Sequence, residues 1–222
     1  IAFPSFGNYE GMLGWSQAGQ YEAEMQAAAE TYEPIYEKFA AMDFMALTQD
    51  EEAQALGKSL FASYCTTCHG SDARGAPGYP NLTDDDWQWG NSEQAITTTI
   101  SMGRNAMMTP WGQILGSDEA VTNMARYVRS LSGLEEADEA AQAMATQFTM
   151  LCSACHMPDG TGNPLLGAPN LTDDVWLYGS SVDIVSTTIA EGRSGQMPAH
   201  GELFGENRTK ILAAYVYSMS QN

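Results

Sequence analysis

The sequence is poor in basic residues and histidine, and it has no long apolar run. Its 222 residues hold 9 Lys and Arg against 28 Asp and Glu, for a net charge of −19. A chain this acidic has no basic face that could neutralise phosphates, so the charge excludes nucleic-acid binding. No apolar run reaches the roughly 18 residues that a membrane span needs. The hydrophobic content of 44% is typical of a folded globular protein.

The chain also lacks an initiator methionine and a charged leader, since it begins Ile1-Ala2-Phe3-Pro4. This start is typical of a fragment or a processed product, so we expect a missing upstream segment. That segment is where a membrane anchor would lie.

The chain has four cysteines, and they form two pairs with the same spacing. Each cysteine pair is followed at once by histidine: Cys65, Cys68 and His69 in one case, and Cys152, Cys155 and His156 in the other. This C-x-x-C-H pattern is the attachment motif of c-type haem. Two thiols on one turn reach the two porphyrin vinyl groups, and the adjacent imidazole binds iron as proximal ligand. The sequence therefore predicts two covalently bound haem c groups.

Three other interpretations of the cysteines are weaker. A thioredoxin-like redox pair is typical of a βαβ unit, and the sequence indicates none. A shared zinc site usually has its pairs about 15–20 residues apart, whereas here Cys152 follows Cys65 by 87 residues. A disulfide within C-x-x-C closes too short a loop to stabilise a fold.

The chain contains an internal repeat. The segment Pro-Asn-Leu-Thr-Asp-Asp stands at 80–85 and returns at 169–174, and the offset between copies stays between 87 and 89 residues. We predict four parts: an N-terminal helical extension over 1–56, a first haem domain over 57–132, an acidic linker over 133–140 and a second haem domain over 141–222.

Each copy has a mostly helical pattern. The segments 53–64 and 140–151 are periodic and lead into the haem motifs, and Ser117 is placed to cap a helix that ends near Leu131. The equivalent helix of the second copy is predicted to begin at Asn207. Aromatic residues on the first and last helices of each copy are expected to meet. The pattern predicts an all-α protein of two tandem small cytochrome c domains.

The negative charge is concentrated outside the repeats. Of the 19 excess charges, 13 fall in the extension 1–56 and the linker 133–140. We interpret this charge as solubilising the extension and holding the linker extended between two nearly neutral domains.

The small number of histidines limits the choice of the sixth ligand of each iron. Only His200 remains once the two motif histidines are used, and methionine is the other common axial ligand. The repeat aligns Met108 with Met197, each at the end of a Gly-Arg-x-x-x-Met segment, and these two are the candidate ligands. Met107 stays open as a rival of Met108, and His200 as a rival of Met197.

The residues around the ligands also recur. Pro80 and Pro169 are placed so that their carbonyls accept the Nδ1–H of each proximal histidine, although they could only shape turns. Arg104 and Arg193 precede the candidate methionines and could pair with haem propionates, or remain solvated surface charges.

The sequence resembles the di-haem subunit family (CcoP/FixP) of cbb3-type haem-copper cytochrome c oxidases. The segments that carry the likeness are 60–65, 68–73, 80–87 and 127–133 in the first copy, 167–173, 176–181 and 212–218 in the second, and 32–36 and 40–42 in the extension. The resemblance implies two class I cytochrome c domains. It also implies His69 with Met108 as the ligands of one iron and His156 with Met197 as those of the other, although Thr109 replaces the usual proline after Met108.

The same resemblance implies an environment and partners. Members of the family are anchored in the bacterial inner membrane with the haem domains on the periplasmic side. They take electrons from a cytochrome c donor and pass them to the mono-haem subunit and on to the oxygen-reducing subunit, without catalysis of their own. Two alternatives remain: a freestanding soluble di-haem shuttle, which would not need the segment 1–52, and a catalytic di-haem enzyme, which needs an open or unusually ligated iron.

Overall fold

The computed structural model describes residues 15–221, which form two compact units with a boundary after Asp43. The N-terminal unit contains one long helix, α1 (Gln17–Ala40), whose N-terminus is capped by Ser16. Helix α1 lies within the predicted extension 1–56, whose first 14 residues lie outside the described part. Residues 44–56 of that predicted extension belong instead to the second unit. Within residues 15–221, no helix combines the length and the apolar character that crossing a membrane requires.

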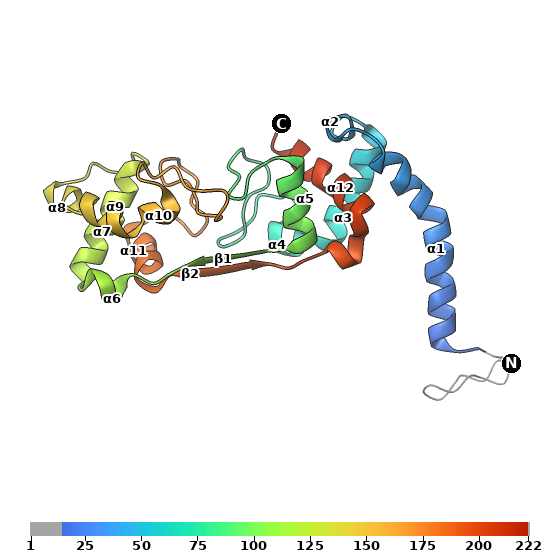
Figure 1. Ribbon diagram of the computed structural model, residues 1–222, viewed down its shortest axis with the longest axis horizontal. Coiled ribbons are helices and arrows are strands. Elements are labelled where there is room, and N and C mark those ends of the chain that lie inside the picture. Colours follow the sequence, from blue (N-terminus) through green and yellow to red (C-terminus); the bar gives the residue numbers. More distant parts are fainter. Residues whose placement is uncertain (1–14, 222) are drawn as a thin grey trace. The chain divides into compact units, whose positions relative to one another are not determined.

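The second unit, which we call the haem body (residues 44–221), is mostly helical (Figure 1). Its helices are α2 (Phe44–Leu47), α3 (Glu51–Tyr64), α4 (Thr66–His69), α5 (Glu93–Met102), α6 (Gly112–Leu115), α7 (Asp118–Leu131), α8 (Glu139–Gln142), α9 (Ala145–Leu151), α10 (Ser153–His156), α11 (Val182–Glu191) and α12 (Gly201–Met219). Two strands, β1 (Arg104–Met108) and β2 (Arg193–Met197), complete it.

The helix boundaries follow local capping chemistry. The Ser117 hydroxyl accepts a hydrogen bond from the Ala120 amide, which is the N-cap predicted for α7. The predicted helix 140–151 is divided into α8 and α9. The last helix begins earlier than the predicted Asn207, but Gly205 interrupts it at φ 65°, so its regular part starts close to the predicted position.

The last helix of each sequence copy packs in the other copy. Helix α12, from the second copy, packs on α3 and α5 of the first, and α7, from the first copy, packs on α11 of the second. Tyr215 of α12 packs at a tilt against Phe61, with ring centroids 5.8 Å apart, and Tyr127 of α7 packs edge-on against Phe148 at 5.6 Å. The expected aromatic contacts therefore exist, but each joins the two copies.

Two equivalent hydrogen bonds mark where the chain crosses over. The Trp111 amide donates to the carbonyl of Ile189 in α11, and the His200 amide donates to the carbonyl of Ile100 in α5, both at 2.9 Å. We define the first lobe as 44–103 with 198–221, and the second lobe as 109–192. The second lobe is thus inserted into the first, and the contiguous halves 57–132 and 141–222 are not the packed units.

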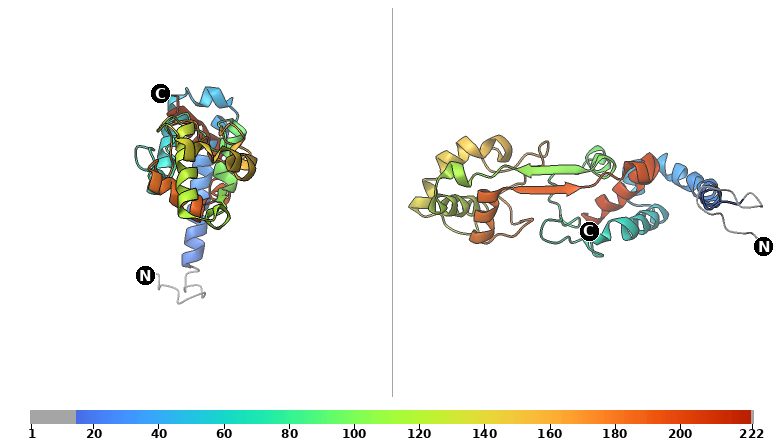
Figure 2. Two further views of the ribbon diagram at one scale, coloured as in Figure 1. Left: turned by 90° about the vertical axis from the view of Figure 1, so that its left-hand side faces the viewer. Right: turned by 90° about the horizontal axis from the view of Figure 1, so that it is seen from below.

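The connection between the lobes is an antiparallel two-stranded ribbon of β1 and β2 (Figures 1 and 2). Its register pairs Arg104 with Met197 at one end and Met108 with Arg193 at the other. Neither strand was expected from the sequence. Side chains alternate between half-buried and exposed along both strands, which is the period of a ribbon with one covered face.

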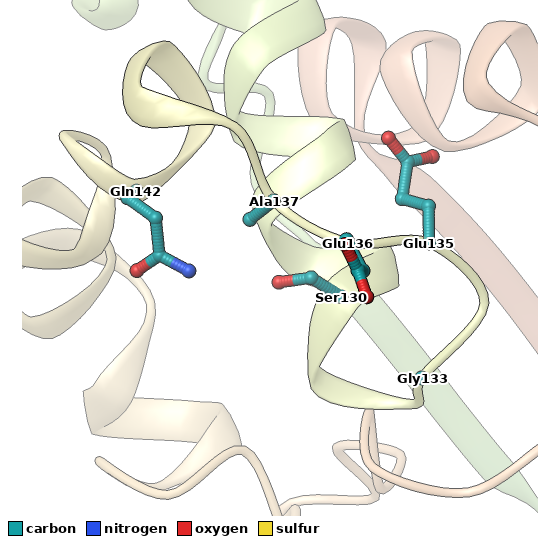
Figure 3. Close-up of a pocket in the computed structure, with 6 residues that line it drawn as sticks. All are labelled: Ser130, Gly133, Glu135, Glu136, Ala137 and Gln142. Atoms are coloured by element: carbon teal, nitrogen blue, oxygen red, sulfur yellow. The ribbon is translucent and has the colours of Figure 1, made fainter.

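The segment 133–140 is not an extended interdomain linker. It joins α7 to α8 within the second lobe, and Arg126 and Arg129 donate to the two oxygens of the Glu135 carboxylate at 3.0 and 2.7 Å. Arg126 also pairs with Asp138 at 2.7 Å. The acidic charges therefore fold this segment back on α7, and the shallow hollow along it contains none of the motif residues (Figure 3).

The two lobes also touch through equivalent loops. Trp89 lies against Gly167, where an added Cβ would fall 2.1 Å from the indole, and Tyr178 lies against Gly78. The Gly78 amide donates to the Leu177 carbonyl at 2.8 Å. The two contacts involve equivalent residues of the two copies. The loops that follow the two haem motifs therefore face one another.

Candidate haem sites

Each C-x-x-C-H motif forms a single helical turn directly after a longer helix. Cys65 ends α3, and the His69 amide donates to the Cys65 carbonyl at 2.9 Å. The second motif repeats this geometry, with His156 bonded to Cys152 at 2.9 Å. Residues three apart on a turn share a face, so both thiols of a motif project together beside the imidazole.

None of the four cysteines forms a disulfide, so all four are available for thioether bonds to haem. The first cysteine of each motif is half-buried and the second is exposed. Burial, and then the neighbouring cysteine, raises the pKa of Cys65 and of Cys152 to about 11. Before haem attachment these groups are therefore neutral thiols near neutral pH.

The proximal histidines are buried, and a hydrogen bond at Nδ1 orients each ring. His69 and His156 are each 9% exposed. Their Nδ1 atoms lie 3.1 Å from the Pro80 carbonyl oxygen and 3.0 Å from that of Pro169. Desolvation lowers the pKa of both rings, which favours the neutral tautomer that donates from Nδ1 and leaves Nε2 free to bind a metal.

Two glycines that the sequence reasoning missed make this arrangement possible. Gly75 has φ 70°, and an added Cβ would lie 2.7 Å from the Pro80 carbonyl carbon; Gly162 has φ 80° and lies equally close to Pro169. Each amide donates to the carbonyl of its proximal histidine. Their recurrence ten residues after the first cysteine of each motif was the available signal.

The two arginines begin the strands of the ribbon, and each contacts the helix that precedes it in the chain and an aromatic ring. Arg104 donates from Nε to Thr99 at 2.8 Å, and its guanidinium lies 4.6 Å from the centroid of Trp89. Arg193 donates to Thr188 at 2.9 Å and lies 4.4 Å from the centroid of Tyr178. The pairing of either arginine with a haem propionate stays a prediction.

The candidate methionines occupy opposite ends of the ribbon. Met108 and Met197 are half-buried on its covered face, whereas Met107 is 85% exposed on the other face. His200 precedes α12, and its ring lies 5.7 Å from that of Phe204. The structure thus separates Met108 from Met107 by the side of the ribbon that each occupies.

The residues fit a haem group by a further observation. Among the described residues, the indole Nε1 atoms of Trp87 and Trp176 are buried without a hydrogen-bond partner. A buried, unpaired N–H is costly unless a ligand supplies the acceptor, and a haem carboxylate is such an acceptor. The two atoms recur at equivalent positions, once in each copy.

The acidic loops that face one another differ in charge. Burial, and then Asp173, Asp84 and Asp85, raise the pKa of Asp86 to about 6. The equivalent position in the second copy is Val175. The proximity of Asp173 to Asp86 also reflects how closely the two loops approach.

Comparison with known proteins agrees with this site. Residues 52–128 and 139–216 match the family described as cytochrome c oxidase, cbb3-type, subunit III. The chain belongs to this family. The cbb3-type oxidase subunit CcoP of Rubrivivax gelatinosus is 42% identical over 99% of this chain and 72% of its own length. The corresponding values are 36%, 98% and 79% for the subunit FixP of Azorhizobium caulinodans, and 34%, 99% and 82% for CcoP of Cereibacter sphaeroides.

Membership in the subunit III family confirms the predicted fold class of two class I cytochrome c domains. It also confirms that the chain carries two covalently bound haem c groups. In this structure, Cys65 and Cys68 with His69 would hold one haem, and Cys152 and Cys155 with His156 the other. When bound, the haem irons supply one-electron redox chemistry; the protein supplies burial and a fixed imidazole.

Proposed function

We propose that this chain is the di-haem electron-transfer subunit of a cbb3-type cytochrome c oxidase, without oxygen chemistry of its own. The observation that carries the proposal is the pair of equivalent proximal sites, each with a buried histidine whose Nδ1 is bonded to a proline carbonyl. An imidazole held in this way is a fixed, basic ligand suited to reversible iron oxidation and reduction.

The direction of electron flow follows from the family. The chain accepts electrons from a cytochrome c donor and passes them through its two haems to the mono-haem subunit and then to the haem-copper subunit. We also propose that a segment upstream of Ile1 anchors the full protein in the inner membrane with the haem body on the periplasmic side.

The N-terminal unit favours this role over that of a freestanding shuttle. Helix α1 exposes three large side chains, Tyr21, Met25 and Tyr32, at 52–62%. Their spacing places them on one side of the helix. A soluble carrier that needs only two haem domains has no use for this segment, whereas a subunit of a larger complex has neighbouring chains to contact.

The methionines favour a relay over a catalytic enzyme. Both iron sites have a candidate sixth ligand, Met108 or Met197, which would leave neither iron open to oxygen or peroxide. The test is a ferrous spectrum of the native protein with CO. We expect no prompt CO binding; stoichiometric binding to one haem would contradict the relay function for that haem.

The subunit role is tested by reconstitution. An oxidase preparation that lacks this chain should consume oxygen slowly with reduced cytochrome c, and adding the full-length anchored chain should restore the rate. A variant with Cys65→Ala, Cys68→Ala, Cys152→Ala and Cys155→Ala should not restore it. Equal rates with and without the chain would contradict the proposed function.

A further inference from the structure

Helix α1 carries an apolar stripe with the spacing of a coiled-coil seam. The members of this seam follow one another at alternating steps of three and four residues. They are Ala18, Tyr21, Met25, Ala28, Tyr32, Ile35 and Phe39. A seven-residue repeat with two apolar positions keeps one side of a helix facing a second helix that winds around it. The seam continues through three such repeats, which favours packing against another helix.

The seam is buried at its C-terminal end and open toward its N-terminal end. Phe39 is fully buried, whereas Tyr21, Met25 and Tyr32 each leave more than half of the side chain exposed. Single exposed apolar residues are ordinary on protein surfaces, but a row of large ones on one side of a helix is typical of an interaction site. Tyrosine and methionine are also enriched in protein interfaces. The open part of the seam therefore has the character of a docking surface.

Pro34 does not interrupt the seam. A proline inside a helix removes one backbone hydrogen bond and bends the helix, yet α1 runs through it from Gln17 to Ala40. With 3.6 residues per turn, Pro34 lies about 200° around the helix from Tyr32, on the side away from the seam. Pro34 is exposed there, so a partner that lies along the seam does not contact it.

The charges of α1 indicate the chemistry of the partner. The helix has five glutamates and one lysine, for a net charge of −4. Glu22 and Glu24 lie beside the seam, next to Tyr21 and Met25, at the positions whose charges select the partner of a coiled coil. A second copy of α1 would bring like charges together, and an anionic lipid surface would repel them. A helix with lysine or arginine beside its own apolar seam complements both the apolar and the acidic positions.

The place of α1 in the chain agrees with a partner in the oxidase. The proposed membrane anchor lies upstream of Ile1, and α1 is the first helix of the described residues. Among the described helices it is therefore the nearest to the anchor along the chain, and the other membrane-spanning chains of the complex lie beside that anchor.

We propose that α1 packs lengthwise, as one half of a two-helix coiled coil, against a basic amphipathic helix of another oxidase subunit. Tyr21, Met25 and Tyr32 make the apolar contacts, and Glu22 and Glu24 pair with lysine or arginine of the partner. The inference rests on the proposed function as an oxidase subunit and goes beyond it by naming the contact surface and the chemistry of the partner. Because the seam contains none of the haem-motif residues, its loss should leave both haems attached.

The first test titrates the full-length anchored chain into an oxidase preparation that lacks it, and follows oxygen consumption. In the variant with Tyr21→Ser, Met25→Ser and Tyr32→Ser, we expect the half-saturating concentration of the chain to rise at least about tenfold. The covalent haem content, measured by intact mass, should stay unchanged.

The matched control has three serine substitutions on the opposite side of the same helix, Ala23→Ser, Ala27→Ser and Glu30→Ser, all at exposed positions. It lowers the helix propensity of α1 in a similar way and should leave the half-saturating concentration unchanged. If the unsubstituted chain does not restore oxygen consumption, the proposed function fails. If it does, and the seam variant acts at the same concentration, the docking proposal alone is overturned.

Charge reversal tests the basic character of the partner. We expect Glu22→Lys with Glu24→Lys, beside the seam, to raise the half-saturating concentration. Glu30→Lys with Glu37→Lys makes the same change in net charge on the opposite side of α1 and should have a smaller effect. Equal effects of the two pairs would overturn specific pairing beside the seam.

Photo-cross-linking in the assembled oxidase identifies the partner. A photoreactive residue at position 25 should cross-link to a helix of another oxidase subunit that carries lysine or arginine, as peptide mass spectrometry would show. The same residue at position 27, on the opposite side, is the control and should not give this product. A cross-link from position 25 to a second copy of this chain, to lipid or to this chain itself would overturn the proposal.

Discussion

The two lobes contain the same haem motif but are built from the chain in different ways. The second lobe is one continuous stretch, and its contact between Tyr127 and Phe148 spans a short segment. The first lobe is assembled from both ends of the haem body, so that Ser218 donates to Gln54 across 164 residues. The difference teaches that duplicated sequence units need not be folding units: equivalent helices can pack equally well in either copy.

Removing the last helix is the strongest way to break this comparison. A chain that ends at residue 200 loses α12, which packs on α2, α3 and α5 of the first lobe. We therefore expect loss of the haem at Cys65 and Cys68 and retention of the haem at Cys152 and Cys155. Intact mass and peptide mapping measure this; loss of the second haem alone would contradict the exchanged packing.

The aromatic pairs allow the two lobes to be compared by single substitutions. Phe61 and Phe148 are 3% and 1% exposed. Truncation of a buried phenylalanine typically costs about 3–5 kcal/mol. We expect Phe61→Ala to destabilise the first lobe and Phe148→Ala the second, by about this amount in each case.

Hydrogen exchange of the holo-protein separates the two effects. In Phe61→Ala, protection should fall in α3 and α12 and persist in α7. In Phe148→Ala, it should fall in α7 and α9 and persist in α12. Equal loss in both lobes for either variant would mean that the haem body unfolds as one cooperative unit.

The facing acidic loops give a smaller, pH-dependent difference between the lobes. The raised pKa of Asp86, about 6, exceeds the value of about 3.9 expected when unfolded. The folded state therefore binds the proton more tightly, so stability falls as pH rises from about 4 through 6. Because Asp86 is half-buried, solvent screening keeps the effect below about 1 kcal/mol.

Thermal unfolding at pH 4.5 and pH 7 measures this pH-dependent change in stability. We expect Asp86→Asn to be more stable than the parent at pH 7 and to lose that advantage at pH 4.5. Val175→Ala, at the equivalent position of the second copy, is the control and should shift the midpoint equally at both pH values.

The smallest expected effect concerns the segment after α7. Glu135 bridges Arg126 and Arg129, with its side chain 20% exposed. Surface ion pairs contribute about 0–1 kcal/mol. We expect Glu135→Gln to lower the stability of the second lobe by that amount in low salt and by less in 0.5 M salt, as chemical denaturation would measure. A neighbouring variant, Glu136→Gln, serves as the control.

The sequence predicted the local chemistry well and the connectivity poorly. The haem motifs, the Ser117 cap and the contacts from Pro80 and Pro169 follow from residue spacing, since each depends on neighbours in one copy. The exchange of α7 and α12 could not be predicted in this way, because both helices present an equivalent tyrosine to an equivalent phenylalanine. Which phenylalanine each tyrosine meets depends on where the chain turns.

The ribbon could not be predicted from its two segments. Their side chains alternate between covered and exposed positions in the structure, but the residues themselves do not alternate between apolar and polar types, and five residues are too few to separate a strand from a loop by pattern alone. The segment 133–140 was misread for a related reason: its charges indicated an extended linker because Arg126 and Arg129 were assigned to a different domain.

The inserted position of the second lobe has a consequence for the order of assembly. Every helix of the second lobe precedes α12 in the chain, so that lobe can close while the last residues are still being delivered. The first lobe must hold Cys65, Cys68 and His69 open until the final helix arrives. The entropic cost of closing so long a loop grows only with the logarithm of its length. The order of events is nevertheless set by the chain: the haem motif that is synthesised first is enclosed last.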